Sequence, residues 1–478
     1  DADGGRAYAD RLITLTAIIL FVLSVLAIVM APLIVKLYTP SDYPQNEFDL
    51  AVAFTRLCLP QIFFYGIYTM FGQVLNTRGK FGAPMFAPIA NNIVAISTFL
   101  LFIYFAGTAA AAEGNLSSGQ VWLLGLGTTL GVVAQALILI PVLIRAGYMW
   151  RPRFDLRGHG LGKAGKLAVW TIGLVLVNQL TYIVITRLAT QANVNAAAQE
   201  VVAAGLTTYQ KAHLVFMLPH SVITVSIITA LLPALSRVAH AGKLSQVGRD
   251  ISGALRLVSF FIIPVTAILF VVGISVAVLL FGFGAATTQQ AELMGQVISI
   301  FMLGMIPFTL FYVLLRGYYS LEDTKTPFFI TVIFSLVLLA LIVPFFDNFT
   351  GGGEQISFMA ACYSGSYWVG LLIAWIVLAR KLGGLQSGTT IASITRMGVA
   401  GLFSVFAMLL AQTQLNNAMF GSSESVDLTD KMSVLIRLLV VVCVGVVSYL
   451  LTAWIFRVPE ITLAYRVIRE KLGSKVKS

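Results

Sequence analysis

Apolar residues form long runs along this chain, and short polar stretches separate them. Each run is long enough to cross a hydrocarbon core of about 30 Å as an α-helix. Membrane-crossing strands would be about half as long and would alternate polar with apolar residues, and no such alternation occurs. The sequence therefore predicts an all-α polytopic membrane protein. Twelve spans are expected, at 12–37, 50–75, 84–107, 119–146, 164–192, 206–236, 250–281, 294–319, 326–346, 356–379, 389–412 and 432–456.

Composition agrees with a bilayer location, because 58% of the 478 residues are hydrophobic and only 11% are charged. The three cysteines, Cys58, Cys362 and Cys443, lie inside spans without CxxC spacing, so we expect them to pack rather than to form disulfides or bind metal. No HExxH, P-loop or GxSxG motif occurs, and the four histidines lie apart. We therefore expect a protein that is not an enzyme, with no catalytic residues, no metal and no cofactor.

The basic residues predict how the chain is oriented. Lys and Arg accumulate in alternate loops, as cytoplasmic loops do, while the intervening loops are acidic. The alternation holds over all twelve spans and predicts that both ends of this chain are cytoplasmic. The net charge of +11 then reflects topology and attraction to anionic membrane lipids rather than nucleic-acid binding. We expect the tail from Arg457 to Ser478 to be a basic amphipathic helix at the inner surface or a solvated end.

An internal repeat predicts two lobes. The span at 50–75 carries Pro60 before an aromatic cluster and a basic exit, and the span at 294–319 carries Pro307 in the same setting. Both copies keep their loops on the same sides, as parallel transporter repeats do. The second copy follows two further spans and the first follows none, so we expect two N-terminal helices to precede this chain in the whole protein.

The repeat divides the chain into predicted parts with pseudo-symmetric helical lobes. These are a partial N-terminal lobe at 1–150, a C-terminal lobe at 151–388, two appended helices at 389–456 and a basic cytoplasmic tail at 457–478.

Cations within the spans are candidates for substrate binding, because an ionisable group in a membrane is costly and usually faces a cavity. Arg56, Arg187 and Lys211, with His213, are predicted to bind an anionic headgroup through charge-assisted hydrogen bonds. Snorkelling to the interface remains an alternative for the cations, and packing for the histidine. No Asp or Glu falls in the interior of a predicted span, whereas proton- or sodium-coupled exporters commonly hold one there.

Uncharged polar residues within the spans suggest contacts between helices, and prolines within the spans suggest helix kinks. Asn91, Asn178 and Gln179 are predicted to hydrogen-bond between helices, with the lobe interface as an alternative. Pro60, Pro219 and Pro307 are predicted hinges for alternating access. The run Gly351-Gly352-Gly353 is expected to be a flexible outer loop.

Four segments resemble the MurJ (MviN) lipid II flippases of the MATE-like exporter superfamily. They are Arg56-Leu57-Cys58-Leu59-Pro60, Leu75-Asn76-Thr77 with Phe81-Gly82-Ala83-Pro84-Met85-Phe86-Ala87-Pro88, Leu231-Leu232-Pro233-Ala234-Leu235-Ser236, and Gly317-Tyr318-Tyr319-Ser320-Leu321-Glu322-Asp323-Thr324-Lys325-Thr326-Pro327.

The resemblance implies a fourteen-helix fold of which this chain holds the third to the fourteenth. It also implies export of undecaprenyl-pyrophosphate-linked disaccharide pentapeptide across a bacterial plasma membrane for peptidoglycan synthesis. Two lobes would rock around a cationic cavity, with a groove at the last two helices for the lipid tail, and cell-wall synthesis proteins are further candidate partners. Arg56 matches a family arginine four residues before the proline. The family's arginine in the eighth helix has no Arg counterpart, and Lys211 or His213 stands nearby.

Three alternatives remain open at this point. A multidrug exporter of the same superfamily should show a membrane carboxylate and twelve helices in total. A polysaccharide-repeat flippase would differ mainly in headgroup recognition. A membrane scaffold without transport would have little use for Arg56 within a span.

Overall fold

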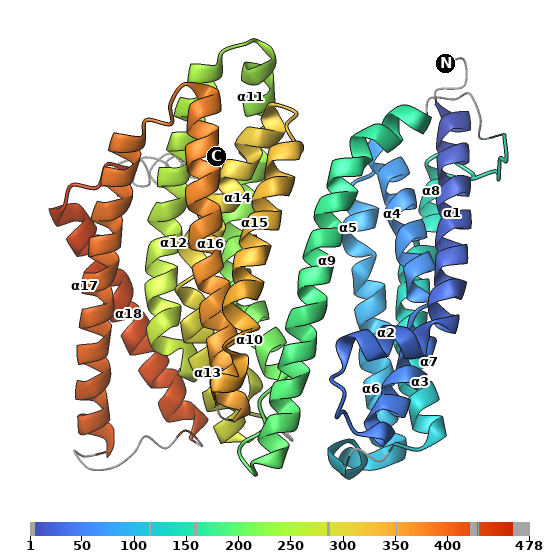
Figure 1. Ribbon diagram of the computed structural model, residues 1–478, viewed down its shortest axis with the longest axis horizontal. Coiled ribbons are helices and arrows are strands. Elements are labelled where there is room, and N and C mark those ends of the chain that lie inside the picture. The colour runs from blue at the N-terminus through green and yellow to red at the C-terminus, as the bar shows by residue number, and fades with distance from the viewer. Residues whose placement is uncertain are drawn as a thin grey trace, which may run out of the picture. The chain divides into compact units, whose positions relative to one another are not determined.

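The computed structural model describes residues 5–113, 116–155, 161–283, 287–349, 351–420, 428 and 430–461. Every regular element in these ranges is a helix, which confirms the all-α prediction (Figure 1). Within these ranges eleven helices are long and apolar enough to cross a membrane, and the number reaches the predicted twelve if the bent pair Thr288–Met302 and Met305–Ser320 counts as one span. The chain separates into two compact units, residues 1–169 and 170–478. The predicted lobe boundaries remain predictions.

Unit 1 contains eight helices in its described residues and the start of a ninth. They are α1 (Arg6–Val29), α2 (Ala31–Tyr38), α3 (Gln45–Cys58), α4 (Gln61–Thr77), α5 (Gly82–Phe86), α6 (Pro88–Glu113), α7 (Ser118–Leu137), α8 (Leu139–Arg145) and α9 (Leu161–Ala198), which continues into unit 2.

The first span differs from the prediction at both of its ends. The helix already begins at Arg6, and it breaks at Met30, where Pro32 lies in the first turn of α2 and supplies no backbone donor. The longer helix α1 includes Asp10, which lies just before the predicted span at 12–37. The Asp10 side chain is buried and accepts a hydrogen bond of 2.7 Å from the hydroxyl of Tyr148, so it is satisfied within unit 1.

Unit 2 holds the remaining helices. They are α10 (Leu206–Pro219), the π-helical turn η1 (His220–Thr224), α11 (Val225–His240), α12 (Leu244–Phe281), α13 (Thr288–Met302), α14 (Met305–Ser320), α15 (Lys325–Ile342), the 3-10 turn η2 (Phe346–Asn348), α16 (Gly352–Leu382), α17 (Ser387–Phe420) and α18 (Lys431–Ile455). The last two helices pack against each other and against α12 (Figure 1).

In unit 1 the helix pair α3 and α4 is interrupted just before Pro60. Because proline has no N–H, the carbonyl of Arg56 lacks its usual helical donor. Side chains of α7 stabilise the interruption: the Thr129 hydroxyl donates to the Leu57 carbonyl at 2.7 Å and accepts from the Gln61 amide at 3.1 Å.

In unit 2 the predicted span 294–319 is broken into α13 and α14, which bend by 49°. Pro307 leaves the carbonyl of Leu303 without its helical donor, and the indole N–H of Trp368 donates to that carbonyl at 3.3 Å. The Ser364 hydroxyl donates to the Ile300 carbonyl, also at 3.3 Å. Both of these side chains belong to α16, so in each unit the broken helix is supported by polar groups of a neighbouring helix.

The triple glycine is a helix start rather than a flexible loop, which corrects the prediction. Gly351 adopts φ +77° before α16, and Gly352 is buried at its first position. A Cβ on Gly352 would come within 2.4 Å of the Ala204 carbonyl and 2.7 Å of the Ala192 carbonyl. Glycine is needed there for close backbone approach. The predicted tail helix lies almost entirely outside the described residues.

Candidate functional site

A cleft of about 380 Å³ lies within unit 2, between α9, α10, α15 and α16. Its walls are mainly aromatic and aliphatic, with a few polar groups, as is usual for ligand sites. None of the residues that line it is a Lys, Arg, Asp or Glu. They are Asn178, Gln179, Thr181, Tyr182, Ile185, Tyr209, Gln210, His213, Phe334, Ser335, Leu338, Tyr363 and Tyr367.

Two hydrogen bonds join neighbouring helices at this cleft. The Gln210 amide of α10 donates to the Tyr182 hydroxyl of α9 at 2.8 Å. The His213 Nε2 and the Tyr363 hydroxyl of α16 are 3.1 Å apart. The buried Ser335 hydroxyl of α15 has no hydrogen-bond partner among the described residues. The cleft therefore offers amide, imidazole and hydroxyl groups to a neutral, hydrogen-bonding ligand.

Aromatic rings make the wall behind these polar groups rigid. The ring of His213 lies 5.4 Å from that of Tyr363 and 5.6 Å from that of Phe301, in edge-on contacts. The ring of Tyr367 lies 4.9 Å from that of Phe308 and 5.0 Å from that of Phe334. Such a cluster fixes the side chains at the cleft by packing.

Three of the residues predicted from the sequence line the cleft: His213, Asn178 and Gln179. Asn178 nevertheless donates to the Leu174 carbonyl of its own helix at 2.9 Å, not to another helix as predicted. Pro219 ends α10 and leads directly into the π-helical turn that continues to α11.

The two cations predicted for unit 2 do not line the cleft. The ammonium of Lys211 lies 5.5 Å from the centre of the Phe281 ring, at the end of α12. Lys431 reaches the same end, where its ammonium donates to the Val278 carbonyl at 3.3 Å. Arg187 is exposed on α9 and makes no hydrogen bond or ion pair with the described residues.

The two residues predicted for unit 1 occupy different settings there. Arg56 is exposed in the last turn of α3 and makes no ion pair with the described residues. Asn91 of α6 packs closely against Gly131 of α7, where a Cβ would come within 2.2 Å of the Asn91 side-chain oxygen. A cavity shared by Arg56 and residues of unit 2 remains a prediction.

Sequence reasoning missed Tyr182, Gln210, Ser335, Tyr363 and Tyr367. Spacing could have found some of them, because Gln210 and His213 lie three residues apart on one helix and Tyr363 and Tyr367 lie four apart on another. A charged residue stands out in an apolar span, whereas the groups at this cleft are polar without being charged.

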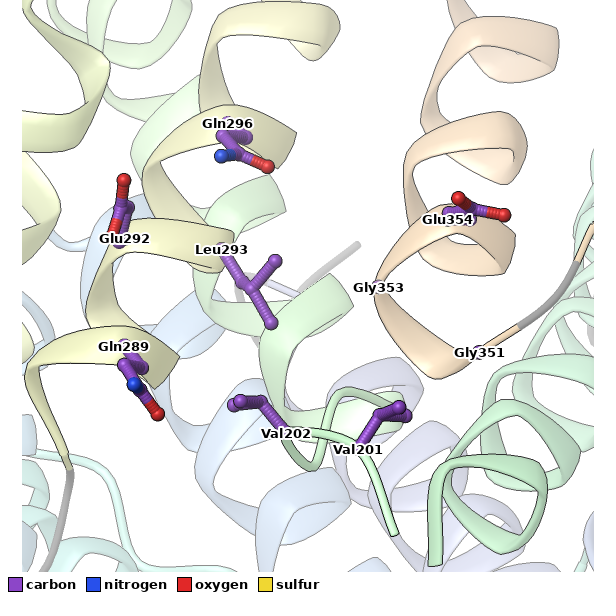
Figure 2. Close-up of a pocket in the computed structure, with 9 residues that line it drawn as sticks. All are labelled: Val201, Val202, Gln289, Glu292, Leu293, Gln296, Gly351, Gly353 and Glu354. Atoms are coloured by element: carbon purple, nitrogen blue, oxygen red, sulfur yellow. The ribbon is translucent and has the colours of Figure 1, made fainter. Parts of the chain in front are cut away.

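A second cavity of unit 2, of about 430 Å³, lies between the starts of α13 and α16 and the segment before α10. Figure 2 shows Glu292 on one wall and Glu354 on the other, with Val201 and Val202 below them. No Lys or Arg lines it, so it is unsuited to a pyrophosphate group. Among the described residues no three His, Cys, Asp or Glu are grouped so as to hold a metal ion.

Comparison with known proteins identifies the family. The family model described as "Lipid II flippase MurJ" matches residues 1–428. The chain belongs to the lipid II flippase MurJ family. Probable lipid II flippases MurJ of Buchnera aphidicola and Vibrio cholerae are 28% and 27% identical to it, over 79% and 76% of this chain. The chain covers 68% and 65% of the length of these relatives.

Solved structures show the same fold. A lipid II flippase MurJ in an inward closed conformation aligns with a TM-score of 0.70 and 19% identity, over 96% of this chain and 86% of that one. A MATE family multidrug resistance transporter of the MOP superfamily, in an inward-facing conformation, aligns with a TM-score of 0.57 and 14% identity, over 79% and 82%. The chain is thus a multi-span protein of a bacterial transporter family, which implies the inner membrane.

Proposed function

We propose that the protein moves lipid II from the cytoplasmic to the outer leaflet by alternating access, for cell-wall synthesis, and that it performs no chemical catalysis. The observation that carries this proposal is the match of the lipid II flippase model to residues 1–428. The cleft of unit 2 supports it, because its uncharged polar groups and rigid rings suit the sugar and peptide parts of the headgroup.

Arg56, Arg187 and Lys211 are proposed to hold the pyrophosphate, with His213 contributing from the cleft. Arg56 differs from the other two candidates in its place, because it stands in the last turn of α3 directly before the break at Pro60. A guanidinium in such a place can form paired hydrogen bonds to phosphate oxygens. Asn178, Gln179 and Asn91 are proposed to serve the lobe interface, and Pro60, Pro219 and Pro307 to act as hinges.

The lipid tail needs an apolar path, and unit 2 offers one. A cavity of about 290 Å³ lies between α12, α16, α17 and the break before α14, lined by Phe270, Leu303, Trp368 and Leu402 among others. We propose that both ends of this chain are cytoplasmic, and that cell-wall synthesis proteins and membrane lipids are further partners.

The test is complementation of cells depleted of their own lipid II flippase, using the full-length gene and measuring lipid II accessible from outside. The informative variants are Arg56→Gln and His213→Ala, each at the expression level of the parent. Their matched controls are Lys80→Gln and His240→Ala, which change exposed residues outside the cleft.

We expect the parent and both controls to restore outward lipid II, and each informative variant to lower it by about tenfold or more, as expected when one charge-assisted or buried polar contact is lost. A parent that folds and is expressed but restores nothing would disprove the proposed substrate. A working parent whose Arg56→Gln variant equals Lys80→Gln would instead remove Arg56 from the binding site.

A further inference from the structure

Unit 2 contains another cavity, of about 480 Å³, where α17 begins, beside α12 and the residues that follow α18. It lies at the end of the unit that is predicted to be cytoplasmic. Its polar lining consists of Arg256, Gln386, Thr389, Ser393, Arg396 and Glu460. The lipid II flippase proposal uses none of these residues.

Both oxygens of the single carboxylate of this cavity have a partner within the protein. Glu460 is buried, with 6% of its surface exposed. Its Oε1 lies 3.1 Å from the Nε of Arg256, and its Oε2 accepts a hydrogen bond of 3.0 Å from the Ser393 hydroxyl. Glu460 therefore fixes Arg256 in place, and each of its oxygens already has a donor.

The cavity keeps an excess of donors. Arg256 uses one further nitrogen in a long bond of 3.4 Å to the Thr390 hydroxyl. Arg396 makes no hydrogen bond or ion pair with the described residues, although its five N–H groups can donate. Two guanidinium groups face one carboxylate, so the net charge is positive. An acceptor-rich anion complements such a set of donors, and phosphate oxygens match the guanidinium fork.

The surface next to Arg396 indicates which kind of molecule carries the phosphate. Phe403 and Leu410 follow Arg396 at seven-residue intervals on the same face of α17, and they are 52% and 49% exposed. The ring of Phe456, just after α18, lies 6.2 Å from that of Phe403. An apolar strip beside a cationic cavity fits acyl chains attached to a headgroup.

We propose that this cavity binds the phosphate group of an anionic membrane lipid. Arg396 is the primary contact, and Arg256, whose position is fixed by its ion pair with Glu460, is the second. The polar residues that line this cavity are not among those proposed to bind the transported substrate, and its occupancy can be measured without transport.

The experiment is native mass spectrometry of the full chain in detergent, titrated separately with phosphatidylglycerol, phosphatidylcholine and inorganic phosphate. The test variant is Arg396→Gln. The matched control is Arg380→Gln, which removes an equal charge from an exposed position at the end of α16 outside the cavity. Arg256→Gln alone would leave the buried carboxylate of Glu460 without its cationic partner. The second test variant is therefore the pair Arg256→Gln with Glu460→Gln.

We expect Arg396→Gln to weaken phosphatidylglycerol binding about tenfold and Arg380→Gln to change it less than about twofold. The paired variant should also weaken it, and phosphatidylcholine should bind poorly throughout. Equal weakening by Arg396→Gln and Arg380→Gln would show only general surface attraction and overturn the site. Inorganic phosphate binding as tightly as phosphatidylglycerol would overturn the lipid as its source.

Discussion

At the scale of one residue, Asp323 shows how side-chain contacts fix the conformation of a loop between two spans. It lies between α14 and α15, where its carboxylate accepts hydrogen bonds from the Thr326 N–H at 2.9 Å and the Thr326 hydroxyl at 2.6 Å, and it forms an ion pair with Lys381 of α16. Burial by itself would raise the pKa of Asp323, but the hydrogen bonds from Lys381 and Thr326 outweigh it and hold that pKa below its usual value.

This network makes stability depend on pH in the acid range. A depressed carboxyl pKa stabilises the folded protein fully above the unfolded value of about 3.9, and the stabilisation is lost as the pH falls through the lower folded value. We expect Asp323→Asn to cost about 1 kcal/mol at neutral pH, similar to the loss of a helix cap. Thermal denaturation in detergent between about pH 6 and pH 3 measures both effects.

The control is Asp347→Asn, because Asp347 is exposed and makes no hydrogen bond or ion pair with the described residues. Asp323→Asn should flatten the acid dependence, and Asp347→Asn should leave it as in the parent. If the two variants behaved alike, the network would not be the source of the acid sensitivity.

Single residues also show what the sequence can reveal of a site. His213, Asn178 and Gln179 were found because a polar side chain within an apolar run is conspicuous, and all three line the cleft. Tyr182 and Tyr363 were not found, because tyrosine is common in membrane helices and only tertiary packing turns its hydroxyl toward a cleft. Lys211 illustrates the converse: its charge is conspicuous, yet its side chain packs against Phe281.

At the scale of the element, apolar runs predict spans well and predict breaks poorly. The span at 294–319 reads as one continuous run, although α13 and α14 bend by 49° within it. Proline marks a missing donor, but whether the helix bends there depends on whether a neighbour can satisfy the freed carbonyl, as Trp368 does for Leu303. The prediction for Gly351-Gly352-Gly353 was wrong for a related reason. A run of glycines does not indicate whether the residues form a flexible loop or allow two backbone segments to come close together.

The bend makes a prediction about α16. Removing both donors, in the pair Ser364→Ala with Trp368→Phe, leaves the carbonyls of Ile300 and Leu303 at the bend without these partners. We expect a loss of about 1–3 kcal/mol in the free energy of unfolding, measured by thermal or denaturant unfolding in detergent. Ser366→Ala is the matched control, since the Ser366 hydroxyl donates to the Tyr363 carbonyl of its own helix. Equal losses in the control and in the pair would refute a supporting role at the break.

At the scale of the whole molecule, helix number and fold class could be predicted because both follow from hydrocarbon thickness and from the satisfaction of backbone groups within each helix. Cleft geometry could not be predicted, because it depends on how α9, α10, α15 and α16 pack. Orientation is a different case: it follows from the basic residues of the loops and needs no packing information.

The predicted orientation can be tested with single cysteines. In a background with Cys58, Cys362 and Cys443 replaced, Lys243→Cys lies between α11 and α12 on the predicted cytoplasmic side, and Gln289→Cys lies at the start of α13 on the predicted outer side. Both positions are exposed. We expect a membrane-impermeant maleimide to label Gln289→Cys in intact cells and Lys243→Cys only after permeabilisation. The same helix connects the two positions: α12, at 38 residues and about 57 Å, is long enough to cross the bilayer and project beyond it. Labelling of Lys243→Cys alone in intact cells would therefore invert every loop assignment in unit 2, and it would place the Arg256 and Arg396 cavity at the outer leaflet.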